Sequence, residues 1–296
     1  MWQYIFLAIE ILNIIAITYI LLGVFLENRP VSHLLSWVFI FLLVPLLGIL
    51  IFVLIGRNIR KRRIYRKKEK ADFQYMQKER GNTSTAVSQY IYESPHITKL
   101  NHLLVNNNKS FLTEGNTTEV LNNGEETYNS IFAALETARH HIHVEYYIIN
   151  EGKIASKLAE ILIRKVSEGV KVRLIYDDFG SWGLRNRFLK KLSDKGVQLK
   201  AFMPVRLHHL ATRINYRNHR KIIVIDGHTG FIGGLNIDDK YISGDPDLGF
   251  WRDIHFKISG PAVEGLQHIF LNDWHFTTGE RLCGNDFFPA IKNNGS

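Results

Sequence analysis

The first fifth of the chain is almost purely apolar, whereas the remainder alternates between apolar and polar positions over short periods. Residues 5–26 carry one charged residue, Glu10, and residues 34–55 carry none. Each run has 22 residues, and such a length gives an α-helix of about 33 Å against a hydrocarbon core of about 30 Å. The pattern therefore predicts a two-helix transmembrane hairpin within residues 1–56.

Beyond residue 95 the spacing of apolar residues switches repeatedly between the helical and the extended period. Gly169 and Gly196 mark the ends of two of the helical stretches. Alternation of this kind favours an α/β domain with parallel strands and helices packed on the sheet, which we place at residues 95–284, followed by a polar tail at 285–296. The predicted helices are 125–139, 153–168, 184–194 and 261–275, and the predicted strands are 141–149, 170–176, 197–202 and 251–259.

A further predicted strand carries the pattern H-x-K-x-x-x-x-D, formed by His219, Lys221 and Asp226. Alternate side chains of an extended segment share a face, so His219 and Lys221 point the same way while the apolar residues that follow enter a core. Asp226 ends this strand beside Gly227, a turn signal, and a return strand leads to the flexible pair Gly233-Gly234.

These residue types suit chemistry at a phosphodiester. Imidazole titrates near neutrality and can form a covalent phospho-intermediate, so His219 is the candidate nucleophile. Lys221 supplies positive charge to the phosphate oxygens, and Asn236 can donate a side-chain hydrogen bond to them. This chemistry requires neither metal nor cofactor. The alternative, from three fixed letters alone, is that His219 and Lys221 are ordinary residues of an amphipathic strand.

The longer string N-H-R-K-I-I-V-I-D-G resembles the signature of the phospholipase D superfamily. With G-G-L-N-I-D-D-K-Y and W-R-D-I-H-F-K-I-S-G-P-A-V it resembles the bacterial cardiolipin synthase branch. The resemblance implies a phospholipase D-like α-β-α sandwich behind the transmembrane hairpin, with Asp226 a structural hydrogen-bond partner and Asp253 an acid that orients a catalytic histidine. It implies these site residues: catalytic His219, Lys221 and Asp226, and substrate-binding Asn236, Gly234 and Asp253.

The resemblance also implies a reaction, in which a histidine attacks the phosphorus of phosphatidylglycerol and a second phosphatidylglycerol takes up the phosphatidyl group as cardiolipin. Members of this branch resemble two such domains in tandem, whereas the complete H-x-K-x-x-x-x-D pattern occurs once in this sequence. We therefore expect a homodimer or a complementary second-half chain as partner, and the tail at residues 285–296 resembles the connector before that second half.

The formal net charge of +9 is concentrated in one segment. Residues 57–70 hold nine Lys or Arg and one Glu, a net of +8, so the rest of the chain sums to +1. This distribution argues against nucleic acid as a partner and predicts that the segment 57–94 is a basic juxtamembrane linker beside anionic lipid. By the positive-inside rule, the domain would lie on the cytoplasmic side of a bacterial inner membrane, below a multi-pass anchor.

Two other readings remain open from the sequence. One is a phospholipase D-type hydrolase or nuclease that works as a homodimer of single motifs, and the other is a catalytically silent, lipid-binding membrane protein. Among the remaining polar clusters, Asp177-Asp178 is predicted to cap the next helix rather than to bind Mg²⁺, with a role in shaping the cleft as second choice. The pairs His140-His141 and His208-His209 are predicted to lie at the surface or at strand ends, because they lack metal-ligand spacing.

Overall fold

The computed structural model describes residues 1–26, 31–52, 94–108, 110, 112–184, 186–205 and 217–289. The chain divides into two compact units, an amino-terminal helical unit and a larger α/β unit, and each is described by itself. The predicted basic run at 57–70, the pair His208-His209 and most of the polar tail lie outside the described residues.

The amino-terminal unit begins with α1, Trp2–Leu26. Its segment Trp2–Gly23 is the one helical stretch, among the described residues, that is long and apolar enough to cross a membrane. Large apolar side chains such as Trp2, Phe6 and Leu12 are exposed along it, as expected of a helix whose natural solvent is not water. The first predicted span therefore has a matching helix.

The second apolar run is not one straight helix. It forms α2, Val31–Leu43, and α3, Pro45–Ile51, separated at Val44, whose backbone is non-helical (φ −143°, ψ 73°). Proline lacks an N–H and forces the preceding residue out of the helical region, so Pro45 accounts for the break. The rings of Trp37 in α2 and Phe52 after α3 lie 4.9 Å apart, which shows that the chain reverses at this point. Over its described part, residues 34–52, the second predicted span is therefore two helices with a break between them rather than one continuous helix.

The larger unit follows the predicted order of helices and strands closely, with boundaries that differ by a few residues. Three elements were not predicted: the helix α5, the strand β1 and the short helix α10. The elements are α5 Pro95–Asn108, β1 Thr117–Asn122, α6 Asn123–Glu136, β2 His141–Tyr146, α7 Lys153–Ser167, β3 Lys171–Asp177, α8 Asn186–Asp194, β4 Gln198–Phe202, β5 Lys221–Ile225, β6 Thr229–Gly233, α10 Lys240–Ser243, β7 Ile254–Ser259, α11 Ala262–Thr278 and the 3₁₀ turn η4 Asn285–Phe287.

In the described part of this unit, seven strands form one sheet in the order β1-β7-β6-β5-β2-β3-β4. β2, β3 and β4 run parallel, whereas β5, β6, β7 and β1 each pair antiparallel with their neighbours. The parallel strands expected from the alternation are β2, β3 and β4, and the return strand expected after Gly227 is β6, which pairs antiparallel with β5. The turn between β5 and β6 has positive φ at Asp226 (51°) and Gly227 (69°), and so short a connection permits only antiparallel pairing. The antiparallel pairing of β5 with β2 and of β7 with β6 and β1 was not predicted.

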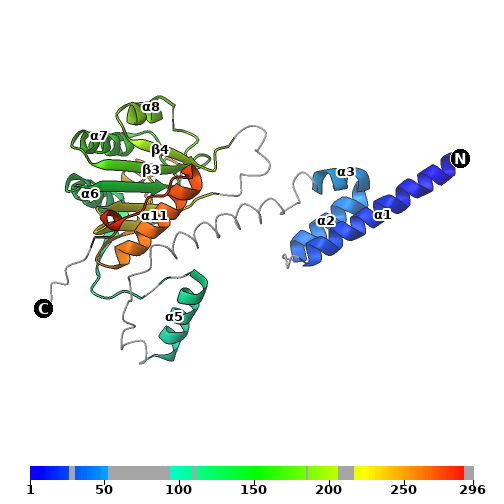
Figure 1. The fold of residues 1–296 in the computed structure, drawn as a ribbon. Helices are drawn as coiled ribbons and strands as arrows, with labels where there is room; N and C mark the ends of the chain where they lie inside the picture. The colour runs from blue at the N-terminus through cyan, green and yellow to red at the C-terminus, as the bar shows by residue number, and fades with distance from the viewer. Residues whose placement is uncertain are drawn as a thin grey trace. The chain divides into compact units, whose positions relative to one another are not determined.

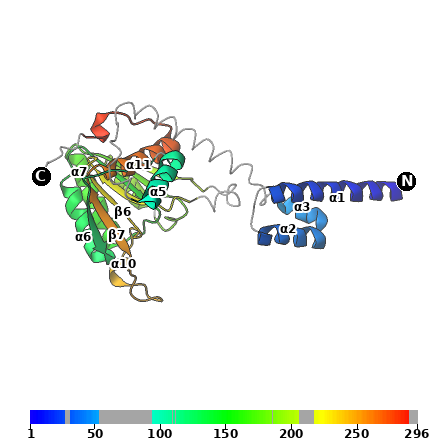
Figure 2. The same ribbon diagram turned by 90° about the horizontal axis from the view of Figure 1, so that it is seen from below.

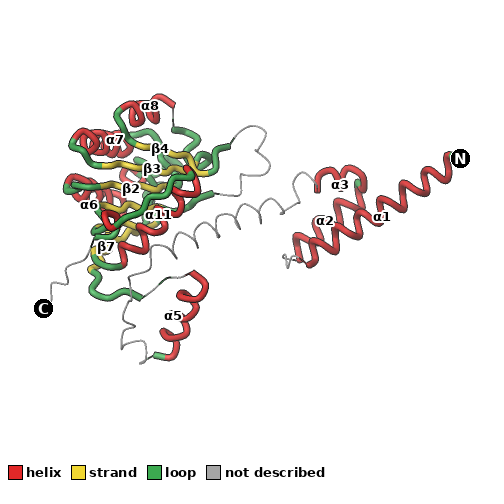
Figure 3. The backbone as a smooth tube through the Cα atoms, in the orientation of Figure 1, coloured by secondary structure: helices red, strands yellow, loops and turns green. Residues whose placement is uncertain are grey.

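Helices cover both faces of the sheet, as the predicted α-β-α sandwich requires (Figures 1 and 2). α6 and α7 lie on one face and α11 on the other; Figure 3 shows the same layers as helices and strands. Between the sheet and α6–α7 lies the main apolar core, which includes Ile223 and Ile225 of β5. A smaller core joins Ile222 and Val224 to α11. β5 is thus buried on both faces, which fixes the position of its polar amino-terminal end.

Candidate active site

One edge of the sheet gathers most of the predicted site residues. β5 and β7 run antiparallel to β2 and β6. The starts of β5 and β7 therefore lie at the same edge of the sheet as the ends of β2 and β6. His219 and Lys221 lie at the start of β5, Gly234 and Asn236 just after β6, and Asp253 just before β7. The structure therefore brings five of the six predicted residues to one edge.

The imidazole of His219 is exposed and lies against the ring of Tyr147, which follows β2. The two rings stack with centroids 3.8 Å apart and an interplanar angle of 20°. Lys221 donates a hydrogen bond from Nζ to the backbone oxygen of His219 (2.8 Å), and its ammonium lies 5.2 Å from the centroid of the same tyrosine ring. His219 and Lys221 thus share a face, as their spacing predicts, and Tyr147 is the platform for both.

The charge on Lys221 depends on two opposing effects. Burial lowers the pKa of Lys221, and the carboxylate of Asp253 raises it. Gly234 leaves room for this carboxylate, because a Cβ at that position would overlap it. The contribution of Gly234 is therefore space rather than a polar contact, and Asp253 acts on the cation at this edge.

The side chain of Asn236 is buried and held at both ends of its amide. Its Oδ1 accepts a hydrogen bond from the backbone N–H of Ile148 (3.1 Å), and its Nδ2 donates one to the hydroxyl of Tyr241 (3.1 Å). A carboxamide nitrogen carries two hydrogens, so this arrangement fixes the orientation of the second N–H.

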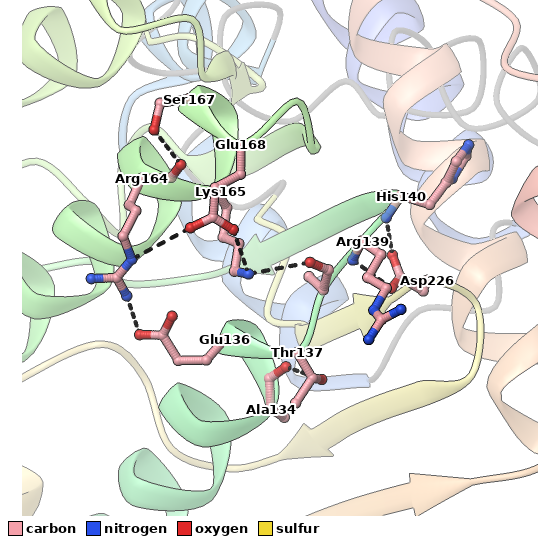
Figure 4. A network of polar contacts seen from close by, with 11 residues as sticks. Ala134, Glu136, Thr137, Arg139, His140, Arg164, Lys165, Ser167, Glu168 and Asp226 are labelled. Carbon is pink, nitrogen blue, oxygen red and sulfur yellow. Dashed lines mark hydrogen bonds and ion pairs between the residues drawn. The ribbon is translucent and has the colours of Figure 1, made fainter.

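Asp226 lies at the opposite edge of the sheet, five residues of strand from Lys221, or about 16 Å. Its carboxylate accepts hydrogen bonds from the backbone N–H groups of Arg139, His140 and His141, each at 2.8 Å. Figure 4 shows Asp226 beside Arg139 and His140 at the start of β2. The structure therefore separates Asp226 from the other motif residues and gives it the structural hydrogen-bonding role that the resemblance implies, although its place in the motif grouped it with the catalytic residues.

The segment that carries His219 is held by the carboxylate of Asp177, which was predicted from the sequence to cap a helix. Asp177 Oδ2 accepts the backbone N–H of Asn218 (2.9 Å), and Oδ1 pairs with Arg217 (3.2 Å), with both side chains of this ion pair buried. Asp177 also accepts N–H groups of the turn that follows β3. The predicted helix-capping role is wrong for Asp177, because α8 begins only at Asn186; shaping the site, the second choice, agrees with these contacts.

Two more buried carboxyl groups, those of Glu145 in β2 and Asp273 in α11, contact the same segment. Asn218 donates from Nδ2 to Glu145 and, at 3.3 Å, to Asp273, and Arg220 forms an ion pair with Asp273. Burial raises the pKa of Glu145 well above its ordinary value, and the charge of Asp273 adds to the effect. Sequence reasoning missed both residues, since they are 128 positions apart and neither belongs to a motif.

The polar face of β2 also corrects an expectation about histidines. His141 begins β2, which is the strand-end position predicted as one alternative, but it is fully buried rather than at the surface. Burial, followed by the charge of His140, lowers the pKa of His141 to about 4. The next histidine on that face, His143, stacks on Phe270 of α11 with centroids 4.2 Å apart. These imidazoles are therefore part of the packing under α11.

His255 of β7 is the other residue near Lys221 that sequence reasoning passed over. It begins a second H-x-K spacing with Lys257, but Ala262 stands where the aspartate would complete the pattern. His255 is fully buried, and neither ring nitrogen has a hydrogen-bond partner among the described residues. Burial, with the charge of Lys221, lowers the pKa of His255 to about 4, so it is neutral beside the cation at pH 7.

Among the described residues, no group of three or more His, Cys, Asp or Glu side chains is arranged to hold a metal ion. The groups that this edge does present are an exposed imidazole, an ammonium and an oriented amide. Such a set can attack a phosphorus atom and stabilise the negative charge on its oxygens.

Comparison with known proteins agrees with this arrangement. Residues 131–274, which contain His219, Asn236 and Asp253, match the family described as "Cardiolipin synthase, PLD-like domain". The chain is 44% identical to a cardiolipin synthase of Geobacillus sp. (strain WCH70) over 94% of this chain and 55% of that protein. It is 41% identical to a cardiolipin synthase of Halalkalibacterium halodurans, over 99% of this chain and 58% of that protein. It is 33% identical to the major cardiolipin synthase of Bacillus subtilis, over 85% of this chain and 53% of that protein.

Among solved structures, the phospholipase D family member Nuc of Salmonella typhimurium superimposes with a TM-score of 0.43 and 15% identity, covering 56% of this chain and 99% of that one. The chain spans about half the length of the curated relatives it matches. The matched domain and the sequence relatives therefore show that the chain carries a PLD-like domain of the kind found in the cardiolipin synthases.

Proposed function

We propose that this chain acts in cardiolipin synthesis, transferring a phosphatidyl group from one phosphatidylglycerol to another with release of glycerol. The observation that carries the proposal is the exposed imidazole of His219, stacked on Tyr147 with the ammonium of Lys221 against the same ring. The names of the relatives supply the substrate class.

In the proposed first step, a ring nitrogen of His219 attacks the phosphorus of phosphatidylglycerol. A phosphorus–nitrogen bond forms, and the bond from phosphorus to the glycerol oxygen breaks. That oxygen takes the electron pair and a proton from a general acid, so glycerol leaves. In the second step, a hydroxyl of another phosphatidylglycerol loses its proton to the same group and attacks, which restores the imidazole and yields cardiolipin.

The remaining residues hold this substrate in place. Lys221 and the second amide N–H of Asn236 bind the non-bridging phosphate oxygens, where negative charge develops. Asp253 favours the charged form of Lys221 against the effect of its burial, which is a different role from the orientation of a histidine that the resemblance implies for this acid. Tyr147 limits the rotation of the His219 imidazole, because a stacked ring must separate before the imidazole can turn.

In the proposal, the general acid is a second imidazole of the same kind. Residues 1–296 carry the complete motif once, and we propose that the second imidazole comes from a second copy of this chain or from a chain that carries the other motif. Either arrangement places two histidines across one phosphate.

The side of the membrane on which the domain lies is inferred from the distribution of basic residues. We infer that the basic run at residues 57–70 and the domain beyond it lie on the cytoplasmic side, facing anionic lipid. A multi-pass anchor with two crossings would place Met1 on that same side. An anchor in which α1 crosses and α2–α3 returns without crossing would place Met1 on the other side, and membrane-impermeant labelling of a tag at Met1 separates these topologies.

The test is expression in membranes that lack cardiolipin, with and without a chain that carries the second motif, followed by lipid chromatography. We expect cardiolipin from the unmodified chain and none from His219→Ala. The matched control is His228→Ala, which removes an exposed histidine at the opposite edge and should leave the product unchanged. Phosphatidic acid in place of cardiolipin would show a hydrolase, and the absence of any product with the second motif supplied would contradict the proposal.

A further inference from the structure

Two loops with exposed apolar side chains flank the candidate site at the same edge of the sheet. The first follows β3 and carries Phe179 and Trp182, whose side chains are 39% and 68% exposed. The second joins α10 to β7 and carries Leu248 and Phe250, which are 71% and 67% exposed. We call these four residues the apolar rim.

The first loop is fixed directly to the catalytic platform. Ser181 donates a hydrogen bond from Oγ to the backbone oxygen of Tyr147 (3.2 Å), the residue on which His219 stacks. The guanidinium of Arg217 lies 5.6 Å from the centroid of the Phe179 ring. The position of Phe179 and Trp182 relative to His219 is therefore built into the site.

The second loop is equally well defined, and it extends from the domain beyond α10 (Figure 2). Asp245 and Gly249 exchange two backbone hydrogen bonds (2.7 and 2.8 Å), and Asp245 Oδ1 accepts the backbone N–H of Leu248 (3.1 Å). Leu248 thus lies at the tip of a closed turn. Phe250 precedes Asp253, the neighbour of Lys221, by three residues.

The strand order places these loops on either side of the phosphate-binding groups. β3 and β7 are four strand spacings apart, about 19 Å, and β5 with Lys221 lies between them. Arg217 and Arg220, which flank His219, are paired with the buried carboxylates of Asp177 and Asp273, so the ammonium of Lys221 supplies the positive charge between the loops. A cationic centre bordered by exposed aromatic and aliphatic side chains matches the profile of a phospholipid, whose charged headgroup adjoins an apolar layer.

We propose that the apolar rim inserts into the interface of a bilayer that contains anionic phospholipid, so that the phosphate of a lipid still in the bilayer reaches His219. The tryptophan suits this position, because its ring combines a large apolar surface with one polar N–H. The presence in the same chain of α1, a helix apolar enough to cross a membrane, agrees with a bilayer as the occupant. The proposal rests on the proposed function for the identity of the lipid that reacts.

The experiment measures the depth of single labelled residues in proteoliposomes of the full chain with phosphatidylglycerol. Cys283 is the one cysteine and is exposed, so Cys283→Ser gives a background for Trp182→Cys and Leu248→Cys, each carrying an environment-sensitive fluorophore. Lys195→Cys is the control, because Lys195 is exposed and lies before β4, at the opposite edge.

We expect a blue shift and at least twofold quenching at positions 182 and 248 by lipids with a quencher on the acyl chain, and neither at 195. This readout needs no turnover, so it can fail or succeed independently of the proposed reaction. Equal fluorescence at all three positions would overturn the proposal. Energy transfer between two labelled chains without lipid quenching would also overturn it, since it would make the rim an interface between copies.

A second measurement compares turnover in vesicles for two double variants of similar chemistry. Leu248→Ser with Phe250→Ser removes half of the rim and should lower turnover of bilayer lipid at least fivefold. Leu100→Ser with Leu103→Ser changes two exposed leucines of α5, 54% and 56% exposed, and should leave turnover within twofold. Equal losses in both pairs would contradict a specific role for the rim.

Discussion

Asp226 has a structural role away from the reacting groups, and Asp226→Ala tests this role. The carboxylate holds three backbone N–H groups at the start of β2, each at 2.8 Å, and one of them, on Arg139, lies at the exposed surface. A hydrogen bond to a charged group contributes about 1.5–3 kcal/mol, and the exposed donor can bond to water instead. Loss of the two part-buried bonds therefore destabilises the fold by about 4 kcal/mol.

The backbone adds a further cost at this position. Asp226 has φ of 51°, a conformation that disfavours alanine by about 1 kcal/mol. At about 2–4 °C per kcal/mol for a domain of this size, we expect Asp226→Ala to lower the melting temperature of the detergent-solubilised chain by about 10–20 °C. Asp226→Asn keeps one acceptor oxygen and tolerates the same backbone, so its loss should be about half as large.

The assay pairs a thermal unfolding scan with turnover measured well below the melting temperature. The protein that remains folded should transfer phosphatidyl groups at close to the normal rate, because the reacting groups lie about 16 Å away. Asp194→Ala, which removes an exposed carboxylate at the end of α8, is the control and should shift stability by less than about 0.5 kcal/mol. An unchanged melting temperature with abolished turnover would refute the structural role.

Three more predictions follow from the pKa directions. Burial, with the charge of Asp273, raises the pKa of Glu145 and so favours the uncharged acid; Glu145→Gln should therefore retain turnover and melting temperature, and a hundredfold loss of turnover would mean that the negative charge is needed. Asp253→Asn removes the charge that raises the pKa of Lys221, so the alkaline limb of kcat/KM should move to lower pH, and a move to higher pH would contradict the assignment. Burial lowers the pKa of His141 and of His255 from 6.5 to about 4, so both are neutral in the folded protein at pH 7. The unfolded chain binds these protons at higher pH than the folded protein does. The free energy of unfolding is therefore unaffected by these two groups above pH 6.5 and falls by up to about 3 kcal/mol for each as the pH drops toward 4. Urea unfolding at pH 7 and pH 5 measures this loss, and equal stability at both would contradict it.

The sequence predicted most elements and the shared face of His219 and Lys221 because both depend on local pattern. The alternation through β2 and the stripe through α7 fix a strand and a helix whatever lies elsewhere. The spacing of His219 and Lys221 likewise fixes a shared face in any extended segment. The apolar first span has a matching helix in α1 for the same reason.

The remainder depends on pairings that no local pattern contains. The turn signal at Gly227 predicted the return of β6 beside β5, whereas the antiparallel pairing of β5 with β2 and of β7 with its neighbours was missed, because no short turn joins those strands. The break at Val44 was missed because membrane helices often tolerate proline. Glu145 and Asp273 meet across 128 residues, so their support of the His219 segment had no signal in the sequence.

The central claim is a covalent intermediate on one imidazole, and trapping that intermediate tests it most directly. Proteoliposomes of the chain, supplied with the second motif, are mixed with phosphatidylglycerol that carries ³²P, quenched in alkaline denaturant, digested and mapped. The account predicts acid-labile label on the peptide that contains His219, lost in His219→Ala and retained in His228→Ala. Turnover without label on His219, or label that persists in His219→Ala, would contradict it.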